Sequence, residues 1–232
     1  MFKIVTLHQK KIFLAGIVIV FSTLSACSIL ENPVVQTLHH TFVHDNNPAN
    51  PALNPHFQYL RITIEGRVVF LALGNIDPNP EGNVEVWYSA SGEVLRLQYG
   101  RIAGATGLFT EWRQVLLPKL PSWSFLAKEK ASYEWTRIRD VMPGYRYGVR
   151  DNLVLRIIPP PKKSGLLNLD PSKLVWFEEK DVSKEVSLPP AKYAVDMSEG
   201  DGTVVYGKLC LARDLCFSWQ RWPATVGVKE SR

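Results

Sequence analysis

The sequence predicts a mainly β protein, a single domain of antiparallel strands in a meander, preceded by a short helical arm. From Phe57 onward, apolar residues recur with a period of two, which is typical of strands that bury one face. These short segments are separated by glycine-bearing turns, a spacing that indicates an up-and-down antiparallel sheet. The pattern leaves two architectures open, a sandwich and an open, barrel-like sheet.

The first 26 residues have the anatomy of a secretory signal peptide. A lysine-bearing segment precedes the apolar run 12–21, which is too short to span a bilayer comfortably. Leu24-Ser25-Ala26-Cys27 matches the lipobox of bacterial lipoproteins, in which the cysteine thiol is diacylated and the chain is cut before it. The alternatives are an ordinary secreted protein and an uncleaved anchor helix, with Cys27 incidental in both.

Lipidation at Cys27 would tether the chain to a membrane. Each buried methylene contributes about 0.8 kcal/mol, so one acyl chain binds marginally and two or three bind stably. In enteric-type bacteria, Asp after the lipidated cysteine tends to retain a lipoprotein in the inner membrane. Ser28 therefore favours the outer membrane, with the protein facing the periplasm. The expected organisation is a signal peptide over 1–26, a lipidated arm and linker over 27–56, and a β domain over 57–232.

The arm and the charge balance argue against two classes of binding. Removing the three lysines of the signal peptide lowers the formal net charge from +5 to +2, without a basic stripe typical of nucleic-acid binding. A short amphipathic helix is expected after Asn32-Pro33. His40 and His44 lie one helical turn apart and could form a metal pair, but a solvated helix face explains them better. We expect no metal, no cofactor and no nucleic acid.

The expected strands follow in order along the chain. A hairpin is predicted at Glu65-Gly66-Arg67, a loop over 159–165, and one or two helical turns over 124–131. The predicted strands are Tyr59–Ile64, Val68–Leu73, Val84–Tyr88, Glu93–Gln98, Arg101–Ala103, Leu108–Val115, Tyr133–Arg139, Tyr145–Val149, Leu153–Ile158, Leu174–Glu178, Lys192–Asp196, Val204–Lys208 and Cys216–Trp219.

Two cysteines remain beyond Cys27, and their spacing predicts a disulfide. If Leu211 pairs with Leu215 across a three-residue turn, Cys210 lies directly opposite Cys216, which suits a cross-strand bridge. The periplasm is oxidising, and closing so short a loop contributes about 2 kcal/mol in the chain-entropy model. Half of a zinc site is the weaker alternative, because the spacing is wide and no histidine lies nearby.

Catalytic motifs are absent from the sequence, so we expect no enzyme activity and no catalytic residue. No nucleophile elbow, zinc-protease helix or phosphate loop occurs. All four histidines beyond the signal peptide fall in the arm: His39, His40, His44 and His56. Two facing carboxylates could hydrolyse a glycosidic bond, but charged residues on a solvated sheet face are also expected. The carboxylates concerned are Glu85, Glu93, Glu111, Glu134, Glu178 and Glu179.

The seven tryptophans are candidates for stacking on sugar rings. Most of them are expected in the core, because large aromatic side chains bury well on pleated surfaces. Trp123 in a loop and Trp222 near the end of the last strand are the two expected to be exposed and able to stack on a glycan.

The segment 81–108 resembles the YjbF-type lipoproteins of group 4 capsule and exopolysaccharide operons. It combines a tryptophan strand, a Ser-x-x-Gly turn ending at Gly92, an alternating strand, Gly100-Arg101-Ile102 and Thr106-Gly107-Leu108. The preceding hairpin, the lipobox and the length fit the same family. Gly92 and Gly100-Arg101 are interpreted as residues that tight turns need. The loop near Pro159 and the cysteine pair depart from the family pattern.

The resemblance implies an outer-membrane-anchored accessory protein for export or assembly of a surface polysaccharide. It would act without catalysis and contact a secretion component of the outer membrane or the glycan itself. The alternatives are a carbohydrate-binding module that holds polysaccharide and a periplasmic glycan hydrolase.

The lipobox gives a direct test. Substituting Cys27→Ser should abolish acylation, because no thiol remains to accept the lipid, and should leave the protein uncut or soluble. Metabolic labelling with a radioactive fatty acid measures this. Label retained by the substituted protein would contradict lipidation at Cys27.

Overall fold

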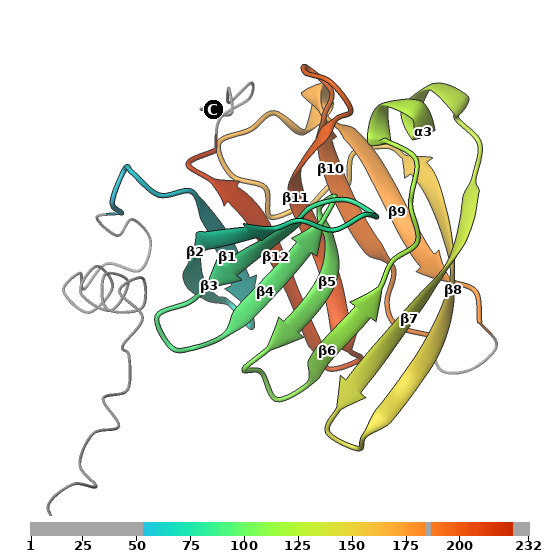
Figure 1. Ribbon diagram of the computed structural model, residues 1–232. Coiled ribbons are helices and arrows are strands. Elements are labelled where there is room, and N and C mark those ends of the chain that lie inside the picture. The colour runs from blue at the N-terminus through green and yellow to red at the C-terminus, as the bar shows by residue number, and fades with distance from the viewer. Residues whose placement is uncertain (1–52, 184–186, 225–232) are drawn as a thin grey trace, which may run out of the picture. The chain divides into compact units, whose positions relative to one another are not determined.

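The computed structural model in Figure 1 describes residues 53–183 and 187–224. The expected signal peptide, Cys27, the arm helix and three of the histidines, His39, His40 and His44, lie outside the described residues. Within the described ranges, no helix has the length and apolarity that a membrane span requires.

Twelve antiparallel strands form a closed barrel in which every strand pairs with its neighbours in sequence and β1 pairs with β12. The strands are β1 (Tyr59–Ile64), β2 (Arg67–Asp77), β3 (Val84–Tyr88), β4 (Val94–Gln98), β5 (Arg101–Thr106), β6 (Glu111–Leu116), β7 (Tyr133–Met142), β8 (Arg146–Ile158), β9 (Val175–Asp181), β10 (Ala191–Asp196), β11 (Thr203–Ala212) and β12 (Leu215–Trp222). The antiparallel meander is confirmed, and its closure corrects the expected sandwich or open sheet. Periodicity reports which face of a strand is buried, but closure depends on pairing between strands far apart in sequence.

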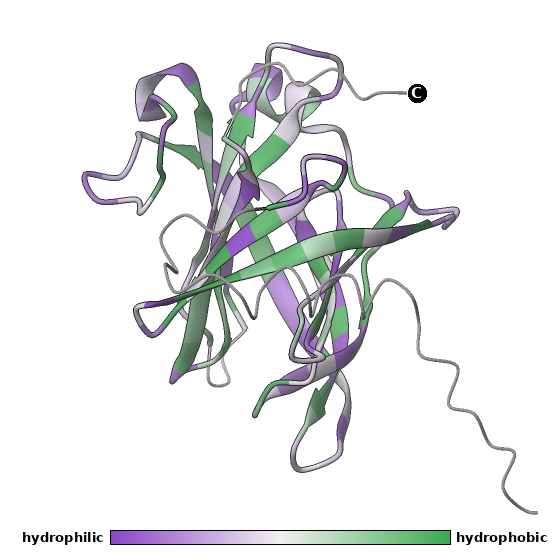
Figure 2. Cartoon of the chain, turned by 90° about the vertical axis from the view of Figure 1, so that its left-hand side faces the viewer, coloured by the Kyte–Doolittle hydropathy of each residue, from purple (hydrophilic) through white to green (hydrophobic). Residues whose placement is uncertain are grey.

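Local turn chemistry fixes the register of the first hairpin. Glu65 and Gly66 both have positive φ, at 49° and 77°, as a two-residue turn between right-twisted strands requires. This turn places Leu60 opposite Leu71, and both side chains lie in the core. Figure 2 shows the strands banded in hydrophobic and hydrophilic colours, the pattern expected when side chains alternate between the two faces.

The strand boundaries differ from the prediction most clearly at β8. The sequence suggested two strands with a break around Arg150-Asp151-Asn152, but β8 is continuous from Arg146 to Ile158. Three successive polar residues resemble a break. The structure buries Asp151 and exposes its two neighbours, so the alternation of the strand continues through them.

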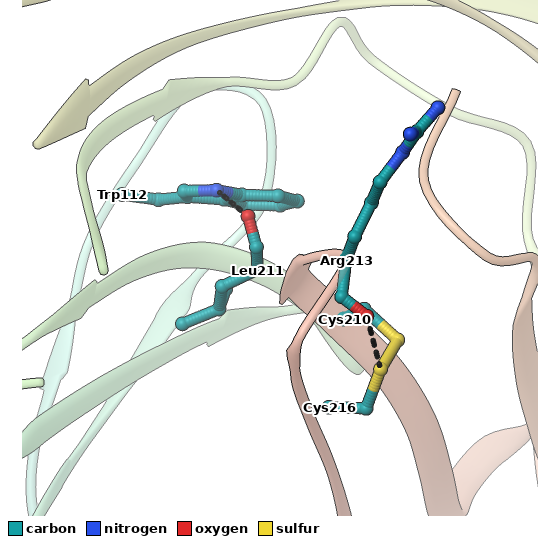
Figure 3. Close-up of a disulfide and its surroundings, with 5 residues drawn as sticks. All are labelled: Trp112, Cys210, Leu211, Arg213 and Cys216. Atoms are coloured by element: carbon teal, nitrogen blue, oxygen red, sulfur yellow. Dashed lines mark hydrogen bonds between the residues drawn. A yellow bond between two sulfur atoms is a disulfide. The ribbon is translucent and has the colours of Figure 1, made fainter. Parts of the chain in front are cut away.

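Large side chains fill the barrel interior. Barrels of about eight strands are filled by side chains, whereas those of about sixteen leave a channel, so twelve strands need bulky residues. Trp87, Trp112 and Trp219 are fully buried in the main core cluster. The indole N–H of Trp112, on β6, donates to the carbonyl of Leu211, on β11, at 3.0 Å (Figure 3). The side chain of Trp112 therefore contacts the backbone of a strand that is distant in the strand order.

A short helix, α3 (Trp123–Glu129), joins β6 to β7, where one or two helical turns were expected. The Ser122 side chain caps it by accepting from the Phe125 N–H at 3.3 Å. The expectation that Trp123 is exposed is wrong, because the side chain is only 2% exposed. Its ring packs against Phe177 at 4.9 Å and Tyr193 at 5.5 Å between centroids, so the helix inserts this indole into the core.

Cys210 and Cys216 form the predicted disulfide between β11 and β12 (Figure 3). The two residues are register partners, as expected. The predicted turn is wrong in detail, because Ala212 and not Leu211 pairs with Leu215, which leaves a two-residue turn. The register shifts between Cys210 and Ala212, and this irregularity buries Leu211 and Cys210 together.

The disulfide predicts that both thiols are protected in the native protein. Alkylation of purified protein without reductant should modify neither Cys210 nor Cys216, since both sulfur atoms are bonded to each other. Mass spectrometry before and after reduction measures this. Two alkylated cysteines in unreduced protein would refute the bridge.

Candidate functional site

Five charged side chains form a continuous network inside the barrel. Arg139 binds Asp151 through two hydrogen bonds, of 2.6 and 3.0 Å, and Arg137 donates to the same carboxylate at 2.9 Å. Arg137 also lies 3.9 Å from Glu179, and Arg101 reaches Glu179 from β5 at 3.3 Å. All five side chains are buried. The network therefore links β5, β7, β8 and β9 across the interior.

Aromatic rings cover the guanidinium groups of this network. Arg101 lies over the Trp123 ring at 3.9 Å from the centroid, and Arg137 and Arg139 lie over Trp112 at 4.5 and 4.7 Å. Guanidinium groups stack favourably on indole faces, most strongly where water is excluded. The tryptophans thus supply contacts that two carboxylates alone cannot give to three arginines.

The electrostatics of the network favour fixed protonation states. Burial raises the pKa of Asp151, but hydrogen bonds and charges from Arg139 and Arg137 outweigh it and lower the pKa below its ordinary value. Burial, followed by the charge of Glu179, raises the pKa of Tyr193, whose hydroxyl donates to Glu179 at 3.4 Å. Asp151 remains ionised and Tyr193 protonated at neutral pH. Neither group is suited to exchange a proton in a reaction near pH 7.

The charge network was not predicted from the sequence. Arg101 was interpreted as a turn residue, but the turn consists of Tyr99 and Gly100, with φ of 50° and 73°, while Arg101 begins β5 and is 2% exposed. A signal was present in β7, because Arg137 and Arg139 share the strand face of Trp135 and Val141, which lie in the core. Charged residues on a core-facing period of two predict buried partners.

Most of the strand carboxylates considered for glycoside hydrolysis have separate polar partners. In the described part of the chain, Glu85 binds Arg221 at 2.6 Å, Glu111 binds Arg113 at 2.9 Å and Glu178 binds Arg156 at 2.6 Å. Glu93 accepts a hydrogen bond from the Ser89 hydroxyl, and Glu134 is exposed. Glu179 is the member of the group that enters the interior network.

A second aromatic cluster lies outside the barrel wall, beneath the loop that follows β8. Trp176 on β9 and Tyr206 on β11 flank Ala194 on β10, with 5.8 Å between the ring centroids. The Trp176 indole donates to the Pro171 carbonyl at 3.0 Å, and the Tyr206 hydroxyl donates to the Ser164 carbonyl.

The side chain of Gln220, on β12, also holds this loop. It accepts from the N–H of Leu167 at 2.9 Å and donates to the carbonyl of Leu167 at 2.7 Å. Leu166 and Leu169 pack against the aromatic cluster. The predicted loop over 159–165 is thus part of a longer segment fixed to the outer wall.

A pocket of about 260 Å³ lies beside this loop. Trp176 and Tyr206 contribute to its lining, together with Pro161, Pro189 and Pro190. Its charged groups are Lys163 from the loop, Glu178 from β9, Lys192 from β10 and Lys208 from β11. Apolar walls with a few convergent polar groups are typical of ligand sites.

The remaining expected site residues are not in this pocket. Trp222 is partly buried and makes an edge-to-face contact with Phe70, at 6.1 Å between centroids, so its role in glycan stacking stays a prediction. Trp123 is in the core and has no exposed face for a sugar ring. His56 is exposed, and no group of three metal-ligating side chains occurs over residues 53–183 and 187–224.

Comparisons with known proteins identify a shared fold. No family model matches the sequence, and no curated protein matches it. The crystal structure of the hypothetical lipoprotein YmcC from Escherichia coli K12 has a TM-score of 0.50 and 16% identity, covering 74% of this chain and 86% of that chain. The Mycobacterium tuberculosis lipoprotein LppX aligns with 13% identity over 74% and 89%, but its TM-score of 0.20 is too low to support an argument. At these identities the likeness to YmcC shows the fold alone.

The interior network predicts a pH-dependent loss of stability. Asp151→Asn should lower the free energy of unfolding at pH 7 by about 3–5 kcal/mol, because two buried guanidinium groups lose their carboxylate. Since the pKa of Asp151 is lowered on folding, its contribution is present above the ordinary value of about 3.9 and disappears as pH falls through the lower folded value. The difference between variant and wild type should therefore shrink below about pH 4.

Urea unfolding of both proteins between pH 2 and pH 7 measures this effect. Glu134→Gln, an exposed carboxylate on the neighbouring strand β7, is the matched control and should change stability little. An Asp151→Asn protein as stable as wild type at pH 7 would contradict the assigned role.

Proposed function

We propose that this protein is a lipid-anchored, non-catalytic binding module of the bacterial envelope that assists export or assembly of a surface polysaccharide. The observation that supports this most is the position of the pocket. It lies on the outer wall between the fixed loop and strands β9 to β11, while the interior is occupied by core side chains and the charge network. Binding would therefore take place on the outside of the barrel.

The lipid anchor is supported by two independent features. The lipobox ending at Cys27 places a cysteine where acylation requires it. The described domain shares its fold with YmcC, which is itself a hypothetical lipoprotein. We infer attachment to the outer membrane, facing the periplasm, from Ser28 and from the resemblance to YjbF-type lipoproteins.

The non-catalytic role is supported by the state of the titratable groups. The carboxylate of Asp151 is bound by Arg137 and Arg139, which favours the ionised form and disfavours a general acid. Glu178 borders the pocket, but Arg156 binds it through two hydrogen bonds of 2.6 and 3.2 Å. Retaining and inverting glycosidases both generally need a second carboxylate across the cleft, and within the described ranges Glu178 is the single carboxylate that lines the pocket.

Two modes of assistance remain, and the pocket favours one of them. An accessory protein could dock to an outer-membrane secretion component or hold the glycan directly. Proline side chains beside charged groups suit the apolar and polar faces of a sugar ring, so we favour direct contact with the polysaccharide. Contact with a secretion component is the second candidate.

Complementation of a deletion strain tests the proposal. Cys27→Ser should strongly reduce surface polysaccharide, because the protein would no longer be concentrated at the membrane. Glutamine substitutions of the strand carboxylates, made one at a time, should leave export nearly unchanged. The residues to substitute are Glu85, Glu93, Glu111 and Glu134, none of which lines the pocket.

The measurement is cell-surface polysaccharide, with protein abundance determined by immunoblot for every variant. If one glutamine substitution abolished export while the protein stayed folded and abundant, the hydrolase alternative would replace the non-catalytic one. Normal export by the Cys27→Ser variant would overturn the need for a lipid anchor.

A further inference from the structure

Two lysines lie directly opposite each other at the pocket. In the register of the outer wall, Glu178 on β9 pairs with Lys192 on β10, and Lys192 pairs with Lys208 on β11. Directly opposed residues have Cβ atoms about 4.5–5.5 Å apart, and like charges in this position are destabilising. The sheet thus places two like-charged residues in register, an arrangement that costs stability.

The neighbouring carboxylate does not offset this charge. Glu178 is bound from the other side by Arg156, its register partner on β8. A third ammonium group, that of Lys163, reaches the pocket from the loop. Over residues 53–183 and 187–224, none of the three lysines forms an ion pair. The described pocket therefore has an excess of positive charge.

The lining next to these cations suits a sugar ring better than a bare ion. Pro189 and Pro190 form an exposed, rigid apolar edge beside Lys192, and Pro161 adds a second apolar surface from the loop. The volume of about 260 Å³ lies near the lower end of ligand pockets, which fits one or two units of a longer chain.

We propose that this pocket binds an acidic sugar residue of a polysaccharide, with the carboxylate of a uronic acid between Lys192 and Lys208 and the ring against the prolines. This inference rests on the proposed function, because it names the class of glycan that the binding module takes. The paired lysines then have a physical reason, since a bound carboxylate relieves their mutual repulsion.

Binding can be measured with full-length protein in detergent at low ionic strength, where screening is weak. The probe is a galacturonic acid hexamer, and its fully methyl-esterified form is the control with the same backbone and no charge. Wild-type protein should bind the acidic hexamer at least about tenfold more tightly than the ester, as expected for loss of a charge-assisted hydrogen bond. Isothermal titration calorimetry gives both dissociation constants.

Variants locate the site. Lys192→Gln and Lys208→Gln should each weaken binding of the acidic hexamer about tenfold. Lys180→Gln is the matched control, because Lys180 is an exposed residue on the outer face of β9 that does not line the pocket. Thermal unfolding of the free proteins should show no loss of stability in the two pocket variants, since each substitution removes repulsion.

Several outcomes would overturn the inference. These are equal affinity for the acidic hexamer and its ester, no detectable binding, or equal weakening by Lys180→Gln. Displacement of the hexamer by inorganic phosphate at equal concentration would show that charge alone is bound and would refute the sugar site. The result is independent of the lipid anchor. If the acidic hexamer binds and the Cys27→Ser variant exports normally, only the anchor requirement is contradicted. If the hexamer does not bind and the Cys27→Ser variant is impaired in export, only the proposed role of this pocket is contradicted.

Discussion

The chain of ion pairs Arg139–Asp151–Arg137–Glu179–Arg101 is the interaction on which the interior depends. Burying charges is costly, and such groups are tolerated only where each is paired and hydrogen-bonded. Here the Asp151 and Glu179 carboxylates are each paired with two arginines, and indole rings cover the guanidinium groups. The arrangement joins β5 to β9 across the barrel, and its removal would leave buried charge without compensation. The positions of these strands therefore depend on ion pairs between residues of different strands.

Because side chains fill the interior, the proposed ligand binding is assigned to the outside of the barrel. The loop after β8 is fixed to the outer wall through the side chains of Trp176 on β9, Tyr206 on β11 and Gln220 on β12. Tyr206 is the register partner of Gln220, and Ala194 on β10 lies between Tyr206 and Trp176. Because these anchors are buried, the loop edge and the adjacent strands form a pocket with a defined lining. The same row of strands that holds the loop brings Lys192 and Lys208 together.

Local features of the fold could be predicted from the sequence, whereas long-range ones could not. The first hairpin follows from Glu65-Gly66, and the disulfide from the spacing of Cys210 and Cys216, because both depend on residues close in sequence. Closure by β1 and β12, the partner of Arg101 and the burial of Trp123 depend on residues brought together only by the barrel. The pocket was missed for the same reason, since its lysines come from three separate segments.

The central claim is that the outer pocket, and not the interior, performs the function. The most direct test is surface polysaccharide in a deletion strain complemented with the double charge reversal Lys192→Glu and Lys208→Glu, with Lys180→Glu as control. The account predicts that export falls toward that of the deletion strain while the reversed protein stays folded, abundant and lipidated, and that the control exports normally. Normal export by the double variant at wild-type abundance would contradict the account.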